Sequence, residues 1–296
     1  MKLLRTPEDR FASLPDYPFE PHYTDIGGIR IHHVEAGPAD GAVVLMLHGE
    51  PTWSYLYRHM LPVLAEAGLR AIAPDLVGFG RSDKPAEVRD YSYAAHVEWV
   101  SEWIRANALE NITLVCQDWG SLIGLRIVAE QPERFARVVA ANAFLPTGDQ
   151  GAPLAFRTWQ AFARFTPILP IGAIVRAGTV RKLPRDIVRA YKAPFPDETY
   201  KAGARAFPVL VPTRSDDPAT PANRRAWAAL RDFDRPFLTV FGERDPIFRG
   251  LDRVLQRHVR GAAGQPHQTL RGAGHFIQED RGVELARITA QFVASA

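Results

Sequence analysis

The stretch "LVCQDWGSLIG", residues 114–124, decides the fold that we predict for this chain. Its apolar beginning indicates the end of a buried strand, and a helix-compatible run over 121–131 follows soon after Asp118. A strand that turns this abruptly into a helix strains the residue at its tip, and Asp adopts left-handed backbone angles more readily than most residues. Cys116 and Gly120 are small enough to clear such a turn. We therefore expect Asp118 at a strand–turn–helix tip, either as a reactive group or as a cap of the helix.

The composition is that of an ordinary globular protein. The chain has 296 residues, of which 46% are hydrophobic and 23% charged, and this suits one large α/β domain with room for an inserted subdomain. Because the net charge is only +3, we interpret the densest basic stretch, 176–192, as a solvated helix face and expect no nucleic-acid partner. The single cysteine, Cys116, provides neither a disulfide framework nor a thiolate metal site.

The sequence also lacks signals for membranes and cofactors. No segment approaches the ~18 unbroken apolar residues of a membrane span, and residues 1–15 lack the apolar run of a signal peptide. We expect a soluble cytoplasmic protein without a membrane partner. The glycines lie in turns rather than in a dinucleotide fingerprint, and no ligand cluster is visible, so we expect no metal and no organic cofactor. The oligomeric state stays open at this point.

Apolar runs alternate with helical stretches along most of the chain. Two short alternating runs within 23–37 predict an antiparallel hairpin at one edge of a sheet. Unbroken apolar strands separated by helices, such as 92–107, are typical of a mostly parallel sheet that is covered on both faces. The expected buried strands lie within 42–49, 69–82, 111–118, 135–144, 236–245 and 267–275.

Residues 147–225 interrupt this alternation. They are rich in Pro, Ala, Phe and Arg, and their apolar residues recur with helical rather than strand periodicity. We predict an inserted helical cap at 147–225 and a core domain formed by 1–146 and 226–296. Ligands of open α/β sheets bind at the carboxyl ends of the strands, so the cap should cover that edge.

Two later strand ends supply a candidate base and a candidate acid. His275 follows the last strand in "RGAGHF" (271–276), and Asp245 follows the preceding strand in "FGERDPIF" (241–248). Asp245 could equally serve a turn before a proline. The chain order nucleophile, acid, histidine is that of the α/β-hydrolase triad. The strand at 135–144 offers only Asn142, which favours Asp245 as the group that orients the histidine.

The first buried strand ends in "HGEPTWSYLYR", residues 48–58. The pair His48-Gly49 is typical of the loop that helps to form an oxyanion hole in this fold. The backbone N–H of Glu50 could form such a hole together with that of Trp119.

An aspartate nucleophile predicts a different substrate from a serine. A carboxylate that attacks a saturated carbon forms an ester, and water activated by histidine can then attack the ester carbonyl and regenerate the aspartate. A serine attacking the same carbon would form an ether, which has no carbonyl. Asp118 therefore indicates a substrate with a leaving group on saturated carbon, either an alkyl halide or an epoxide.

These motifs together resemble the haloalkane dehalogenases of the α/β-hydrolase fold, along nearly the whole chain. The resemblance is to the subgroup whose acid follows the penultimate strand, and "HGEPTWSYLYR" with "QDWG" is its most specific part. The motifs that carry it are "HGEPTWSYLYR" (48–58), "APDLVGFGRSDKP" (73–85), "CQDWGS" (116–121), "AYKAPFPDETYKAG" (190–203) and "GAGHFIQE" (272–279).

The resemblance implies a role for each matching residue. It makes Asp118 the nucleophile, His275 the base and Asp245 the acid. It implies two halide-binding indoles, Trp119 and Trp159, although Trp159 could instead be a core anchor of the cap. Phe156 precedes Trp159 by one helical turn and is expected to line the same pocket, and Glu50 is associated with ordering the hydrolytic water. The implied partners are a small halogenated alkane, water and the halide product.

Three alternatives stay open. An epoxide hydrolase of the same fold would use two cap tyrosines, and 147–225 contains only Tyr191 and Tyr200. A haloacid dehalogenase should have arginines near the nucleophile, where the chain offers only Arg126 on the following helix. A catalytically silent binding protein would have a broken triad.

Overall fold

The computed structural model describes residues 1–149, 151 and 154–295. Its centre is an eight-stranded sheet in the order β10-β9-β8-β7-β4-β5-β3-β2. The strands span β2 His22–Ile26, β3 Ile29–Ala36, β4 Val43–Leu47, β5 Arg70–Pro74, β7 Ile112–Cys116, β8 Phe135–Ala141, β9 Phe237–Gly242 and β10 Gln268–Leu270. Each strand that we expected from the sequence is present.

The direction of the strands also agrees with the prediction. The six strands from β10 to β5 pair in parallel, whereas β3 is antiparallel to both β5 and β2 and so forms the antiparallel edge. Gly27 and Gly28 make the hairpin turn between β2 and β3 with φ of 61° and 87°, values that glycine adopts without strain. All residues of β7 and β9 are buried, which explains why their sequences are apolar without alternation.

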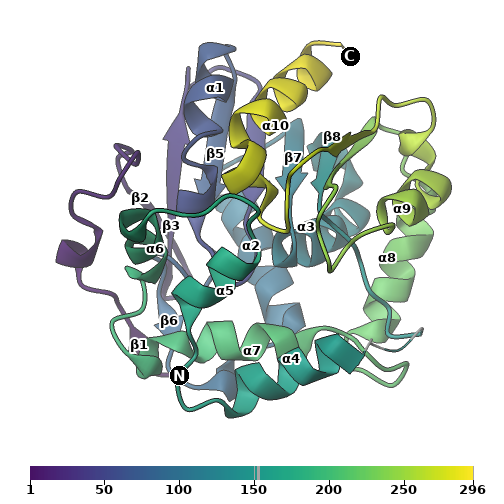
Figure 1. Ribbon diagram of the computed structural model, residues 1–296. Coiled ribbons are helices and arrows are strands. Elements are labelled where there is room, and N and C mark those ends of the chain that lie inside the picture. The colour runs from purple at the N-terminus through teal and green to yellow at the C-terminus, as the bar shows by residue number, and fades with distance from the viewer. Residues whose placement is uncertain (150, 152–153, 296) are drawn as a thin grey trace.

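Helices cover both faces of this sheet. In Figure 1, α1 and α10 lie in front of the sheet, and α2 and α3 lie behind it. The helices of the core are α1 Leu61–Glu66, α2 Tyr93–Ala106, α3 Trp119–Glu130, α9 Asp252–His258 and α10 Ile277–Ala294. Short 3-10 helices occur at Glu8–Phe11, Ser54–Tyr57, Val88–Asp90, Pro132–Arg134, Glu198–Lys201 and Arg260–Ala262.

The described part of 147–225 is helical, as its periodicity predicts. It contains α4 Leu154–Phe165, α5 Ile171–Ala177, α6 Arg185–Lys192 and α7 Ala202–Leu210. In Figure 1, α4, α5 and α7 lie together below the sheet. Helix α8 (Thr220–Asp232) runs across the predicted boundary at 225 and packs against α3, where Arg126 Nη1 donates to Asn223 Oδ1 at 2.8 Å. The division into core and cap therefore stays a prediction, with α8 belonging to both sides of it.

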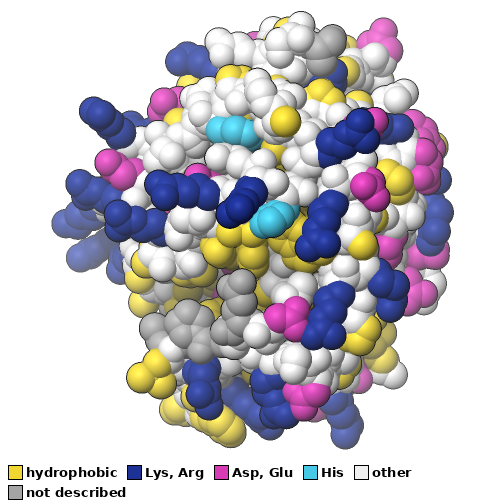
Figure 2. All heavy atoms as spheres, turned by 90° about the vertical axis from the view of Figure 1, so that its right-hand side faces the viewer, with side chains coloured by type: hydrophobic (Ala, Val, Ile, Leu, Met, Phe, Trp, Pro, Cys, Tyr) yellow, Lys and Arg dark blue, Asp and Glu magenta, His cyan; other side chains and the backbone are white. Residues whose placement is uncertain are grey.

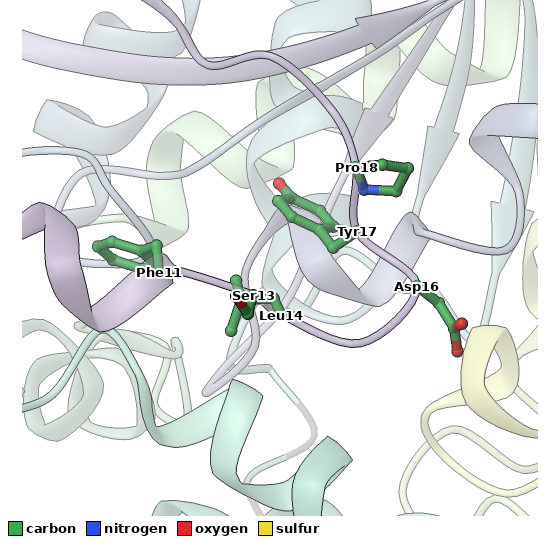
Figure 3. A pocket seen from close by; sticks show the side chains of 6 residues that line it. All are labelled: Phe11, Ser13, Leu14, Asp16, Tyr17 and Pro18. Atoms are coloured by element: carbon green, nitrogen blue, oxygen red, sulfur yellow. The ribbon is translucent and has the colours of Figure 1, made fainter.

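The N-terminal segment forms contacts that the sequence did not predict. Strand β1 (Leu3–Leu4) pairs antiparallel with β6 (Lys84–Pro85) in a separate two-stranded sheet. Figure 3 shows the following segment, in which Tyr17 and Asp16 point in different directions. The hydroxyl of Tyr17 shares a buried hydrogen bond of 2.6 Å with Ser54 Oγ. This segment also lines a surface pocket of about 420 Å³.

The surface carries mixed charges. Figure 2, which views the molecule from the side of α8 and α9, shows basic and acidic side chains interspersed over that face. Every helix within 1–149, 151 and 154–295 is too short or too polar to cross a lipid bilayer. The cytoplasmic location stays a prediction.

Candidate active site

Asp118 occupies a strained turn between β7 and α3. Its backbone has φ 49° and ψ −124°, in the left-handed half of the φ range. The turn is so tight that a Cβ on Gly120 would lie 2.0 Å from the carbonyl oxygen of Leu47, and this confirms the need for a small residue there. The carboxylate makes no capping hydrogen bond to α3 although Asp118 stands at the cap position. Asp118 therefore caps α3 only through its backbone, and its carboxylate is directed elsewhere.

The structure brings the three candidate triad residues together. His275 Nε2 lies 3.7 Å from Asp118 Oδ2, and His275 Nδ1 lies 3.3 Å from Asp245 Oδ2. The His275 side chain is 5% exposed and that of Asp245 is fully buried, whereas that of Asp118 is 16% exposed. The group expected to attack substrate is thus the most accessible of the three.

The electrostatics of the triad couple its two carboxylates to the imidazole. Burial lowers the pKa of His275. The hydrogen bond and charge of Asp245, together with the charge of Asp118, raise the pKa by more than burial lowers it, so it lies above its ordinary value. Burial raises the pKa of Asp118, and the charge of His275 and backbone N–H groups of Trp119 and Glu50 only partly oppose this. A carboxylate that is desolvated in this way is a stronger nucleophile once it is ionised.

Gln117 contacts the imidazole at the nitrogen that faces Asp118. Gln117 Nε2 lies 3.2 Å from His275 Nε2 and also donates to the His275 carbonyl oxygen at 3.2 Å. A carboxylate can only accept, so Nδ1 of neutral His275 donates to Asp245 and Nε2 is left as the acceptor. This tautomer is the one that a general base needs.

Asn142 ties together the segments that carry the triad. Its side-chain amide donates to the carbonyl oxygens of Gly274 and His275 at 2.8 and 2.9 Å, and its Oδ1 accepts the N–H of Gly242 at 2.7 Å. Its own carbonyl oxygen accepts the N–H of Asp118 at 3.1 Å. Asn142 therefore positions the elbow and the histidine loop and does not act as the acid, which agrees with the choice of Asp245.

Glu50 reaches the nucleophile through its backbone. The Glu50 N–H donates to Asp118 Oδ1 at 2.8 Å, so this carboxylate oxygen occupies the expected oxyanion position. The Glu50 side chain is buried, and its Oε1 has no hydrogen-bond partner among the described residues. Burial, together with the charge of Asp118, raises the pKa of Glu50 well above its usual range, which favours the protonated form of its carboxyl group.

Trp119 lies between the core and a cap helix. Its indole is 3% exposed and stacks on Phe207 of α7, with ring centroids 4.2 Å apart and an interplanar angle of 22°. Tyr93 and His96 of α2 contact the same indole from the core. None of the side-chain hydrogen bonds among the residues that the structure describes involves the Trp119 indole N–H.

The chain matches known proteins over nearly its full length. Residues 42–282 match the family model of the alpha/beta hydrolase fold. A haloalkane dehalogenase from Mycolicibacterium paratuberculosis is 57% identical over 291 residues, which cover 97% of this chain and 96% of that protein. The chain belongs to the haloalkane dehalogenase family. Another member, from Psychrobacter cryohalolentis, is 52% identical over 298 residues and covers 99% and 98% of the two chains.

Solved structures of haloalkane dehalogenases have the same architecture. The tetrameric enzyme from Paraglaciecola agarilytica superimposes with a TM-score of 0.91 at 37% identity and covers 97% of each chain. The enzyme from Bradyrhizobium elkani has a TM-score of 0.80 at 25% identity, covering 94% of this chain and 100% of that one. The family, the fold and the enzyme class, a hydrolase acting on carbon–halide bonds, are thereby confirmed.

The cap tyrosines do not favour the epoxide hydrolase alternative. Tyr191 is fully buried, and its hydroxyl donates to Oε1 of Glu279. The same carboxylate also accepts hydrogen bonds from both terminal nitrogens of Arg58. A hydroxyl held in this buried cluster is not available to an epoxide oxygen. Tyr200 lies half-buried in the 3-10 helix Glu198–Lys201.

Arg126 is likewise engaged elsewhere. Its guanidinium binds Glu130 of α3 at 2.6 Å and Asn223 of α8 at 2.8 Å, so it is not free to bind the carboxylate of a haloacid.

Few contacts define the surroundings of Trp159, the predicted second halide-binding indole. Trp159 lies half-buried on α4, with its ring 5.8 Å from that of Phe162, and Phe156 lies half-buried on the same helix. No hydrogen bond or ring contact within the described residues joins Trp159 to Trp119. Trp227, the other indole near the cap, donates its N–H to the Leu145 carbonyl oxygen at 2.7 Å and is therefore occupied. The roles of Trp159 and Phe156 stay predictions.

Sequence reasoning missed Gln117, Phe207 and the tying role of Asn142. Gln117 stood within the quoted "CQDWGS" motif, so its position beside the nucleophile was a usable signal. Phe207 offered none, because it lies 88 positions from Trp119 along the chain, on a cap helix whose orientation no local pattern encodes.

Proposed function

We propose that the chain hydrolyses haloalkanes to an alcohol and a halide through a covalent ester on Asp118. The observation that carries the proposal is a carboxylate, rather than a hydroxyl, at the tip of the elbow, with His275 Nε2 3.7 Å from its free oxygen. A carboxylate nucleophile requires a leaving group on saturated carbon, because only then does it form an ester that water can cleave.

Alkylation is the first step. Asp118 Oδ1 is held by the Glu50 N–H at 2.8 Å, so Oδ2 provides the electron pair that forms the new C–O bond. The C–X bond breaks with its electron pair, and the halide leaves carrying one negative charge. Trp119 offers an uncharged N–H to that anion, and Trp159 is proposed as the second donor. Donors of this kind stabilise the developing halide more than they stabilise the neutral substrate.

Hydrolysis is the second step. Neutral His275 removes a proton from water at Nε2, and the hydroxide attacks Cγ of the ester, which places negative charge on Oδ1 next to the Glu50 N–H. The tetrahedral intermediate collapses, and the alcohol departs with the proton from His275. Asp118 is left as a carboxylic acid that holds the second proton of the water, and it releases this proton to solvent to become a carboxylate again. Asp245 stabilises the imidazolium that exists between the two proton transfers.

Glu50 is proposed to help order the hydrolytic water. Its carboxyl group is buried, and burial together with the charge of Asp118 raises its pKa, which favours the protonated form that can donate a hydrogen bond as well as accept one. A neutral carboxyl group at this position adds no negative charge that would oppose the attack on the ester.

Bromide release from a bromoalkane tests the proposal. The wild-type enzyme should release bromide and alcohol in equal amounts, and Asp118→Ala should release none while unfolding at a similar temperature. Asp16→Ala is the matched control, because Asp16 is an exposed aspartate with a similar positive φ of 54°. Turnover by a folded Asp118→Ala protein would refute the nucleophile. Diol formation from an epoxide without bromide release would instead support the alternative hydrolase.

A further inference from the structure

The peptide unit between Gly49 and Glu50 is held from both ends. Its N–H is the one that donates to Asp118 Oδ1 at 2.8 Å. Its carbonyl oxygen, that of Gly49, accepts three hydrogen bonds: from His48 Nδ1 at 3.0 Å, from the Thr52 N–H at 2.9 Å and from Thr52 Oγ1 at 2.8 Å. Because a peptide unit is planar, fixing its carbonyl also fixes the direction of its N–H.

The contact of Nε2 shows which ring nitrogen of His48 carries the proton. His48 Nε2 lies 2.9 Å from the backbone nitrogen of Leu76, which can only donate. Nε2 therefore accepts, the ring proton sits on Nδ1, and Nδ1 donates to the Gly49 carbonyl oxygen. Burial lowers the pKa of His48, which favours this neutral form of the ring.

These hydrogen bonds form one continuous chain of aligned dipoles. It runs from the Leu76 N–H through the His48 ring and the Gly49–Glu50 peptide to the carboxylate of Asp118. His48 and Thr52 are fully buried, so water does not compete for these groups. Hydrogen bonds in such a chain polarise one another, and a carbonyl that accepts hydrogen bonds makes the N–H of the same peptide a stronger donor.

Glycine at position 49 permits the close approach. A Cβ there would lie 2.4 Å from Asp118 Cβ, so any other residue would push the peptide away from the nucleophile.

We propose that His48 and Thr52 are positioning residues that fix and polarise the Gly49–Glu50 peptide and thereby accelerate the hydrolysis step selectively. The inference rests on the proposed function, because it assigns opposite charge changes to Asp118 Oδ1 in the two steps. During alkylation Oδ1 loses its share of the carboxylate charge and becomes a neutral carbonyl oxygen. During hydrolysis it gains a full negative charge. A stronger N–H donor at Oδ1 therefore favours the second step and slightly opposes the first.

Thr52→Val separates this role from a purely structural one. The substitution keeps the size and the β-branch of the side chain, removes one donor to the Gly49 carbonyl and leaves the Thr52 N–H in place. We expect the hydrolysis rate constant to fall roughly three- to thirtyfold, less than when an oxyanion donor itself is deleted. The alkylation rate constant should stay within about twofold of the wild-type value or rise, because the resting carboxylate is stabilised less.

Rapid-quench measurements with 1-bromohexane provide the two constants. Bromide reports alkylation, hexanol reports hydrolysis, and mass spectrometry of the peptide that contains Asp118 reports the ester between them. In Thr52→Val the ester should accumulate and bromide should show a larger burst than in the wild type. Thr52→Ser retains the hydroxyl and should restore hydrolysis. Thr52→Ala removes the hydroxyl without placing a methyl group near the carbonyl oxygen and should repeat the effect of Thr52→Val.

Thr289→Val is the matched control. Thr289 is equally buried, and its Oγ1 donates to the Leu285 carbonyl oxygen at 2.8 Å within α10. The Thr289→Val substitution should leave both rate constants unchanged while it lowers the thermal stability about as much as Thr52→Val does. If the Thr52 variants slow both steps equally, or leave hydrolysis unchanged, the positioning role is overturned while the proposed function stands. A wild-type enzyme that forms no ester on Asp118 would overturn the proposed function and this inference with it.

Discussion

Replacing Asp245 by Asn should impair the second chemical step by a calculable amount. Asp245 Oδ2 lies 3.3 Å from His275 Nδ1 and both side chains are buried. Two unit charges at that distance attract by roughly 5 kcal/mol at an effective dielectric constant near 20. Asn keeps the size of the side chain but removes the charge that stabilises the imidazolium. Because the amide dipole and nearby water recover part of the attraction, we expect hydrolysis of the alkyl-enzyme to slow roughly 10³-fold.

Alkylation should survive this substitution, because the imidazolium forms only in hydrolysis. Quench-flow with a bromoalkane should show a bromide burst of about one equivalent per active site, followed by very slow turnover, and mass spectrometry should find the ester on Asp118. Asp280→Asn is the control: Asp280 Oδ2 accepts the N–H of Gly274 at 2.8 Å in the same loop region, and no hydrogen bond among the described residues joins it to the imidazole. Equal losses in both steps, or hydrolysis as fast as in the Asp280 variant, would refute the reasoning.

Three further perturbations test other parts of the site. His275→Phe should leave alkylation intact and trap one alkyl group on Asp118, and intact-protein mass spectrometry after incubation with a bromoalkane would reveal an unmodified chain if this is wrong. Hydrolysis should be lost as the pH falls through the pKa of His275. This pKa should be lower in the alkyl-enzyme than in the resting enzyme, because the ester removes the Asp118 charge that raises it. Single-turnover pH profiles of the two steps would show which of the two pKa values is lower. Trp159→Phe should slow chloroalkanes more than bromoalkanes, by roughly ten- to a thousandfold, as the loss of one anion donor does; undiminished steady-state rates on both substrates would remove Trp159 from the halide site.

The sequence contained enough to predict the framework of the site. The strand ends at Cys116, Gly242 and Leu270 each precede a polar residue within a few positions, and parallel strands bring such residues to one edge. That geometric rule, together with chain order, predicts Asp118, Asp245 and His275 from the sequence. The elbow conformation is predictable for a different reason: the turn needs small neighbours, and only a residue as small as Gly120 fits against Leu47.

Contacts between distant segments could not be predicted. The amide of Asn142 reaches carbonyl groups more than 130 positions away, and Tyr191 meets Glu279 across 88 positions. The motif "AYKAPFPDETYKAG" resembles the family, but it does not reveal that the hydroxyl of its Tyr191 binds a buried ion pair. Helix periodicity tells which residues are apolar, but the orientation of a cap helix depends on packing against the core. For that reason Phe207 was missed and Trp159 stays a prediction.

The groups around Trp119 fit the halide-donor role that we propose for its indole. The polar group that contacts this indole from α2 is His96, which is fully buried among aromatic rings, and burial lowers its pKa to about 3. His96 is therefore neutral wherever His275 can act as a base. The guanidinium of Arg126, which lies over the Tyr93 ring, is paired with Glu130. A permanent cation beside the halide would hold the product tightly and would need a counter-charge in an apolar pocket. An uncharged N–H stabilises the departing anion and still lets it leave, so that the ester on Asp118 can be hydrolysed and the site used again.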